Sequence, residues 1–136
     1  MQKGIVHLAR RPSVLASASV VGKEESRGPL GALFDVVDET DRFGTDTWEK
    51  AESEMQRRAL RCALDRLGWQ DTHLDALLAG DLINQCTGSA YGLLEYDVPY
   101  FGLYGACSTV AEGLVLASLL YGSGVYDRLG VVSSSH

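Results

Sequence analysis

The chain has 136 residues and a formal net charge of −6, with a pI near 4.9. Such an acidic chain has no basic stripe to neutralise phosphates, which argues against nonspecific nucleic-acid binding. Hydrophobic residues make up 46% of the sequence and charged residues 22%, a balance typical of one globular domain with a sizeable core. The longest mostly apolar stretch, residues 110–125, is interrupted by Glu112 and by glycines and serines, so we expect no membrane span.

The cysteine and histidine content argues against a disulfide framework and against a metal site. The chain has three cysteines, Cys62, Cys86 and Cys107, an odd number with no C-x-x-C pair. We therefore expect reduced thiols in a cytosolic compartment. The three histidines are far apart in the sequence, so the chain is predicted to hold no metal ion and no cofactor.

The first elements in chain order are a strand and a long connection. Val14–Val21 carries valine, leucine and serine in near alternation after Pro12, which predicts a strand. Residues 22–46 are rich in glycine and acidic side chains and contain one small apolar island, Leu30–Val37. We expect a long loop here, and a loop of this length is usually functional or packed against a partner.

A helix is predicted to follow. Asp46 and Glu49 have the spacing of a capping box, and Gly68 is suited to end the helix. Apolar residues recur between them at steps of three and four: Trp48, Ala51, Met55, Ala59, Ala63 and Leu67. These positions are expected to face the core.

Strands and helices then alternate to the end of the chain. Leu74–Ile83 is a nearly continuous apolar run, typical of a strand buried on both faces, and residues 84–96 favour a helix. Val98–Ala106 is predicted to be a second buried strand. A helix from Ser108 to about Gly122 and a strand over Gly130–Ser135 complete the series. This alternation with short connections predicts an α/β layered architecture with crossover units.

The stretch "GLYGACSTVAEG" places Cys107 at the junction of a predicted strand and helix. Backbone N–H groups at a helix start lack intrahelical partners, and the helix dipole adds positive potential there. Both favour a thiolate, and the same groups are suited to bind a carboxylate or phosphate. Ser108 and Thr109 add hydroxyls as caps or ligand contacts. Cys107 is therefore a nucleophile, a pocket residue or a small core side chain.

Two other polar pairs leave alternatives open. Asp81 and Asn84 follow a predicted buried strand, where they either line a site or satisfy backbone groups. Asp127 and Arg128 come after the helix that begins near Cys107. They lie either at the rim of a ligand pocket or on the solvated surface.

Three segments carry a family resemblance: "GPLGALFDVVDETDRFGTDTWEKAE", "LDALLAGDLINQ" and "GLYGACST…SSSH". In this order and spacing they resemble the stage V sporulation protein AD (SpoVAD) family, within the thiolase-like superfamily of thiolases and ketoacyl synthases. The likeness runs from about Pro12 to His136. It implies an α/β fold, here the first half of a thiolase-like layered α-β-α fold that has two similar halves.

The resemblance also implies a function. Members of this family bind dipicolinic acid, free or as its calcium chelate, and assist its uptake into the developing spore. They act with membrane proteins of the same operon, as peripheral proteins on the cytoplasmic side of the forespore inner membrane, and thiolase-like folds commonly form homodimers. The expected ligand contacts in this chain are Cys107, Ser108, Thr109, Asp127, Arg128 and His136.

Family members are much longer than this chain. We therefore expect residues 1–136 to be an N-terminal thiolase-like half-domain, a fragment of a longer protein that lacks the second half. In thiolase-like enzymes that half supplies the histidine beside the nucleophile, so catalysis is not the favoured interpretation. The alternatives are an acyltransferase or condensing enzyme that uses a Cys107 thioester, and a noncatalytic subunit that seeks a partner.

Overall fold

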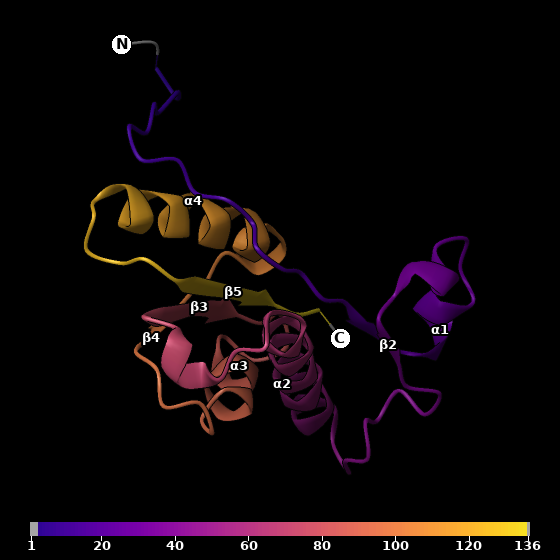
Figure 1. The fold of residues 1–136 in the computed structure, drawn as a ribbon. Coiled ribbons are helices and arrows are strands. Elements are labelled where there is room, and N and C mark those ends of the chain that lie inside the picture. Colours follow the sequence, from indigo (N-terminus) through magenta and orange to yellow (C-terminus); the bar gives the residue numbers. More distant parts are fainter. Residues whose placement is uncertain (1–2, 136) are drawn as a thin grey trace.

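The computed structural model describes residues 3–135, and a three-stranded sheet lies at its centre (Figure 1). β3 (Ala76–Gly80) is the middle strand, between β4 (Tyr100–Gly102) and β5 (Leu129–Ser133). All five residues of β3 are buried, as the apolar run in the sequence predicts. The strand therefore forms the centre of the molecule.

Both strand pairs are parallel, which confirms the predicted crossover architecture. Leu78 of β3 lies opposite Phe101 of β4 and Val131 of β5. The carboxyl ends of the three strands consequently meet at one edge of the sheet, and the amino ends meet at the other. In open parallel sheets, ligands bind outside the carboxyl edge.

Helices cover the two faces of this sheet (Figure 1). α2 (Trp48–Leu67) and α3 (Thr87–Gly92) lie on one face, and α4 (Thr109–Gly122) lies on the other, over β5. This is the layered α-β-α arrangement that the sequence predicts. The core between α2, α3 and the sheet consists of apolar side chains: Leu60, Leu64, Leu77, Ala79, Leu93, Tyr96 and Val132.

The ends of α2 follow local chemistry. The Thr47 hydroxyl accepts a hydrogen bond from the Lys50 backbone N–H at 3.2 Å, so Thr47 is the N-cap. The capping-box spacing had suggested Asp46 instead. Asp46 instead forms an ion pair with the Lys50 ammonium at 2.7 Å. Gly68 ends the helix with φ of 65°, a left-handed conformation that glycine adopts without strain.

The buried face of α2 differs from the predicted one. Its fully buried positions include two polar side chains and recur mainly at four-residue steps: Ala51, Glu52, Gln56, Leu60 and Leu64. The predicted face shares only Ala51 with this set, because small apolar residues such as Ala59 and Ala63 are compatible with partly exposed positions as well. The buried face of α2 thus includes Glu52 and Gln56, which apolar periodicity does not reveal.

α3 is shorter than the predicted helix over residues 84–96. It lies very close to α2, because a Cβ atom on Gly92 would overlap the Ser53 carbonyl oxygen. The Ser53 hydroxyl also donates a hydrogen bond to the Gly88 carbonyl oxygen at 2.8 Å. Gly92 is therefore a close packing position between the two helices, whereas a Cβ atom on Gly88 would meet the Asp81 side chain at 3.3 Å.

The prediction of a buried strand over Val98–Ala106 is wrong in length and burial. Only Tyr100–Gly102 forms strand β4, and all three residues are exposed. β4 pairs with β3 on one side only, so it is an edge strand. Its two aromatic residues, Tyr100 and Phe101, are 37% and 39% exposed. An apolar run alone does not distinguish an edge strand from a central one.

The predicted strand Val14–Val21 is also shorter than expected. Only β1 (Val20–Val21) pairs, in parallel, with β2 (Val36–Val37), and a four-residue helix α1 (Lys23–Ser26) lies between them. Residues before Val20 run extended beside α4, where Arg10 holds them (Figure 1). Its guanidinium donates to the Tyr121 carbonyl oxygen at 3.2 Å.

Candidate functional site

Cys107 lies at the carboxyl edge of the sheet, on a short 3-10 turn, Ala106–Ser108, between β4 and α4. Its side chain is exposed, so the interpretation as a small core residue is wrong for this chain. Ala106 immediately before it has φ of 47°, a left-handed conformation that costs a residue with a Cβ about 1–3 kcal/mol. A strained turn therefore presents the thiol at the start of α4.

The start of α4 has no side-chain cap. The Ser108 hydroxyl donates to the Gly105 carbonyl oxygen at 2.7 Å and so does not cap the helix N–H groups. Thr109 is only 1% exposed, and its Oγ1 has no hydrogen-bond partner among the described residues. The N–H groups of Ser108 and Thr109 already donate within the preceding turn, to the carbonyl oxygens of Gly105 and Ala106. The donors for an anion beside Cys107 are therefore the N–H groups that follow Thr109, with the helix dipole.

A carboxylate that sequence reasoning missed lies at the same place. Glu112 in the first turn of α4 folds back over Gly105, where a Cβ atom would overlap Glu112 Oε2. The position of that hypothetical Gly105 Cβ atom also lies 3.0 Å from Ser108 Oγ and 3.0 Å from the Thr109 nitrogen. Glu112 Oε2 is buried and accepts no hydrogen bond from the described residues. Its spacing of five from Cys107 was the only available signal.

A second missed group is a buried polar network beneath the carboxyl edge. Glu52 is 0% exposed, and its Oε1 accepts hydrogen bonds from the Ser134 hydroxyl at 2.7 Å and from the Leu82 N–H at 3.4 Å. Gln56 is 1% exposed and donates to the Gly80 carbonyl oxygen at 3.0 Å. This network ties the ends of β3 and β5 to α2.

The structure resolves the alternatives for Asp81 in favour of a backbone role. Its carboxylate accepts hydrogen bonds from the N–H groups of Asn84 and Cys86, each at 3.2 Å, and from the N–H of Ser89 at 2.7 Å. Asp81 is 5% exposed and shapes the loop that follows β3, whereas Asn84 is exposed. Asp81 is thus a support of the carboxyl edge.

The structure does not bring Asp127 and Arg128 to Cys107. Both precede β5 and lie at the amino edge, where their N–H groups donate to Asp75 Oδ2 at 2.7 and 2.8 Å. α4, with 14 residues, separates the two edges by about 20 Å. Asp127 also forms an ion pair with Arg10. One small molecule cannot reach both Cys107 at the carboxyl edge and the Asp127–Arg128 pair at the amino edge. His136, the sixth expected contact, lies outside the described residues.

The other two cysteines lie in different surroundings. Cys86 is buried, and its sulfur lies 2.8 Å from the Tyr100 hydroxyl oxygen. Burial, together with the contact to Cys86, raises the pKa of the Tyr100 hydroxyl above its ordinary value. Cys62 is half-buried rather than part of the core, and it faces an open groove along α2. These positions separate the three thiols by accessibility.

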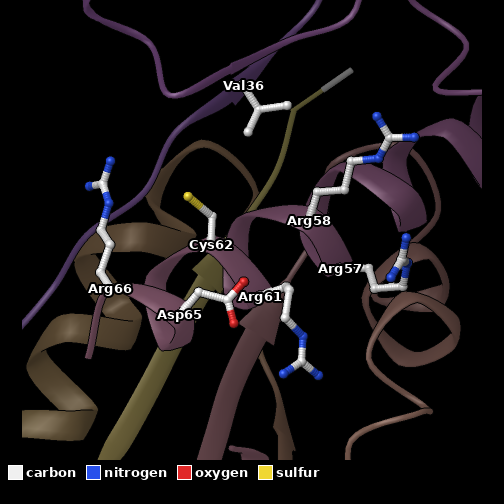
Figure 2. A pocket seen from close by; sticks show the side chains of 7 residues that line it. All are labelled: Val36, Arg57, Arg58, Arg61, Cys62, Asp65 and Arg66. Carbon is white, nitrogen blue, oxygen red and sulfur yellow. The ribbon is translucent and has the colours of Figure 1, made fainter. Parts of the chain in front are cut away.

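The groove at Cys62 has a volume of about 500 Å³ and is rich in arginine (Figure 2). Figure 2 shows the side chains around it: Val36, Arg57, Arg58, Arg61, Cys62, Asp65 and Arg66. Most of these guanidinium groups already have carboxylate partners. Arg57 and Arg58 pair with Glu54 at 2.6 and 2.7 Å, and Arg66 pairs with Asp35. The groove therefore has little charge left for an anionic ligand.

Two further properties concern the described chain as a whole. Within residues 3–135, no group of three histidine, cysteine or acidic side chains is arranged to hold a metal ion. Nor does any helix in that range combine the length and the apolar character needed to cross a bilayer.

The solved structures define the class of fold. The chain is similar to the crystal structure of 3-oxoacyl-[acyl-carrier-protein] synthase III from Aquifex aeolicus VF5, with a TM-score of 0.52 and 21% sequence identity. The match covers 61% of this chain and 29% of that one. The fold is therefore thiolase-like, and the placement of Cys107 between a strand and a helix belongs to this layered α-β-α architecture.

The family follows from the sequence comparisons. The family model of stage V sporulation protein AD (SpoVAD) matches residues 2–136, so the chain belongs to that sporulation protein family. It is also 34% identical, over 123 residues, to stage V sporulation protein AD of Bacillus subtilis (strain 168). That match covers 90% of this chain, and the chain spans 36% of the length of this relative.

Proposed function

We propose that this chain supplies the cysteine-containing part of a sporulation protein that binds dipicolinic acid and assists its uptake into the developing spore. The observation that carries the proposal is the position of Cys107: exposed, on a strained turn, at an uncapped helix start at the carboxyl edge of a parallel sheet. A planar dicarboxylate needs N–H donors in a fixed arrangement, and the first turn of α4 supports that requirement.

The structure narrows the expected contacts. Cys107, Ser108, Thr109 and the first N–H groups after Thr109 share one end of α4. Asp127 and Arg128 lie at the other end, so we assign them to the amino edge of the sheet rather than to the ligand. In the complete protein, the ligand would take its cationic contacts from elsewhere.

Calorimetric titration tests this function. We expect dipicolinate to bind the folded chain in a saturable way and the Cys107→Ala variant to bind more weakly, because the variant alters the surface beside the helix start. Cys62→Ala is the matched control, since Cys62 lies in the groove on α2. Absence of binding by a chain with native circular dichroism would reject the proposal for residues 1–136.

Acyl transfer through a Cys107 thioester is the second candidate, supported by the exposed thiol at a helix start. It also needs a base beside the sulfur. Neither of the two described histidines lies at the start of α4. His73 precedes β3 at the amino edge of the sheet. His7 is next to Leu8, which lies against Gly122 at the other end of α4. Binding is therefore the better supported function.

The cellular setting is proposed on the same basis. We infer that the complete protein acts with spore-membrane proteins of its operon, as a peripheral protein on the cytoplasmic side of the forespore inner membrane. Homodimer formation through β4 is supported by its free, exposed edge. Light scattering of the chain and of a Phe101→Lys variant tests this: an unchanged mass would argue against a dimer through β4.

A further inference from the structure

β5 is an edge strand of the central sheet, as β4 is on the opposite side. It pairs only with β3, so the N–H and C=O groups on its outer edge have no strand partner within residues 3–135. Only Val132 of β5 is buried, whereas every residue of β3 is buried. An edge strand without a neighbour is a template for a further strand. The sheet is therefore open on the β5 side.

Residues 11–18 form an extended arm on this open side of the sheet (Figure 1). At the start of the arm, Arg10 donates to the Tyr126 carbonyl oxygen at 3.4 Å, in the connection from α4 to β5. Near its end, Arg66 of α2 donates to the Ser17 carbonyl oxygen. Because α4 and α2 cover opposite faces of the sheet, the arm crosses from one helix layer to the other past β5. No backbone–backbone hydrogen bond joins the arm to another described residue.

The side chains of the arm are those of an inner strand. Val14 and Leu15 are 79% and 62% exposed. Successive residues of an extended chain point to opposite sides, so the arm presents a large apolar side chain on each side. This pattern is typical of a strand that is covered on both faces. The arm thus has the sequence of a sheet strand and lacks the strand neighbours that would pair with it.

We propose that β5 and the arm are the two sides of a slot that takes one further β-strand. The occupant is a strand from the part of the longer family protein that this chain does not span, since the chain covers 36% of the length of the Bacillus subtilis relative. Main-chain N–H and C=O groups on both sides bind the strand. Helices cover both faces of the sheet beside β5, so the occupant should be apolar on both faces.

A second copy of this chain fits the slot less well. The slot needs a strand with both edges free, because it pairs on two sides. The edge strands β4 and β5 of a second copy already pair with their own β3 on one side. The arm of a second copy has both edges free, but Arg10 and Arg66 hold it at its two ends. The remainder of the family protein meets this requirement without breaking any contact described above.

Hydrogen exchange followed by mass spectrometry tests the slot, with overlapping synthetic peptides of about 15 residues as probes. The peptides cover the part of the Bacillus subtilis relative outside its match to this chain. In the chain alone, we expect the amides of the arm to exchange as fast as those of an unfolded chain, because no strand protects them. One peptide, at up to about 1 mM, should slow exchange about tenfold in the arm and in β5 together.

Proline variants show whether the backbone does the pairing. Successive N–H groups of a strand point to opposite edges, so only one of Val14 and Leu15 donates into the slot. Of Val14→Pro and Leu15→Pro, one should bind the peptide about tenfold more weakly, and the other should bind it like the original chain. Val6→Pro is the control, since Val6 is exposed and precedes Arg10. Circular dichroism should be unchanged in all three variants, because the arm is unpaired in the chain alone.

Four results would overturn the proposal. The slot is excluded if the arm is already protected in the chain alone, or if no peptide protects the arm and β5 together. Pairing by the backbone is excluded if the variants at Val14 and Leu15 bind the peptide equally well. Protection of the arm that increases with chain concentration, without peptide, would assign the slot to a second copy. None of these measurements involves dipicolinate, so the slot and the proposed ligand site succeed or fail separately.

Discussion

The side-chain nitrogen of Gln56 in α2 donates a hydrogen bond to the carbonyl oxygen of Gly80, the last residue of β3, over 3.0 Å. The same nitrogen lies 2.6 Å from the Ser134 hydroxyl oxygen, just after β5. Gly80 leaves no room for a side chain, because a Cβ atom there would lie 2.8 Å from Thr109 Cγ2. The buried amide of α2 is therefore connected, through Gly80, to the start of α4.

Gln56→Ala should destabilise the chain. The change leaves the Gly80 carbonyl oxygen and nearby serine hydroxyls without their donor and opens a cavity in a fully buried position. We expect a loss of about 2–4 kcal/mol in the free energy of unfolding. Urea denaturation followed by circular dichroism measures it. Gln85→Ala, at an exposed position, should cost less than about 0.5 kcal/mol; equal losses would contradict a structural role for the network.

The sequence predicts the fold well where the signal is local and apolar. The run Leu74–Ile83 contains β3, and the turn chemistry of Gly68 ends α2 as expected. Strand β4 was predicted to be buried because an apolar run has no feature that reports how many neighbours a strand has. The number of neighbours is a property of the whole sheet, and β4 lies at its edge.

The candidate site is predictable only in part, for a related reason. The junction that carries Cys107 follows from the alternation of strand and helix, and the structure places it at a helix start. Glu112 and Glu52 were not predicted, because an acidic residue on a helix is ordinarily exposed and its burial depends on distant segments. Arg128 was grouped with Cys107 because it follows the helix that begins near Cys107, but α4 places the two at opposite edges of the sheet.

Two glycines should respond differently to alanine. In Gly68→Ala a Cβ atom would meet nothing within 4 Å, so the cost is only that of a left-handed φ of 65°, about 1 kcal/mol. In Gly92→Ala the new methyl group would overlap the Ser53 carbonyl oxygen and push α3 from α2, which should cost about 3 kcal/mol. Thermal melts of the two variants check this order, and a larger loss for Gly68→Ala would contradict the close helix contact.

Asp75 should make the chain less stable in acid. The backbone N–H groups of Asp127 and Arg128 hold the pKa of its carboxyl below the ordinary value. The unfolded chain then binds a proton at about pH 4, before the folded chain does, so this stabilisation is present above about pH 4 and lost as the pH falls through the folded pKa. Asp75→Asn should reduce the fall in urea midpoint between about pH 6 and pH 3. Asp97→Asn, at an exposed position, is the control, and an unchanged fall in the Asp75 variant would reject the assignment.

The three thiols should react in a fixed order. Cys107 is exposed, Cys62 is half-buried, and Cys86 is 5% exposed with its sulfur 2.8 Å from the Tyr100 hydroxyl oxygen. We expect Cys107 to react first with a neutral aromatic disulfide and Cys86 to react about a hundredfold more slowly, through opening of the fold. Mass spectrometry after timed quenching assigns each site. Rapid labelling of Cys86 in the folded chain would show that its surroundings differ from those described.

Ala106 should be the most conformationally sensitive position of the candidate site. Its φ of 47° is unfavourable for alanine and more so for a β-branched residue, whereas glycine adopts it freely. Ala106→Gly should therefore leave the free energy of unfolding equal or raise it by up to about 1 kcal/mol, the relief of strain being partly offset by the larger entropy of the unfolded glycine chain.

Ala106→Val should lower the free energy of unfolding by about 2 kcal/mol and slow alkylation of Cys107, because the turn that presents the thiol is no longer formed in its present shape. Urea denaturation and the alkylation rate with iodoacetamide are measured on the same samples, with Ala111→Val on the exposed side of α4 as the control for valine in this region. If Ala106→Val and Ala106→Gly have equal stability, the left-handed turn before Cys107 is not populated in solution.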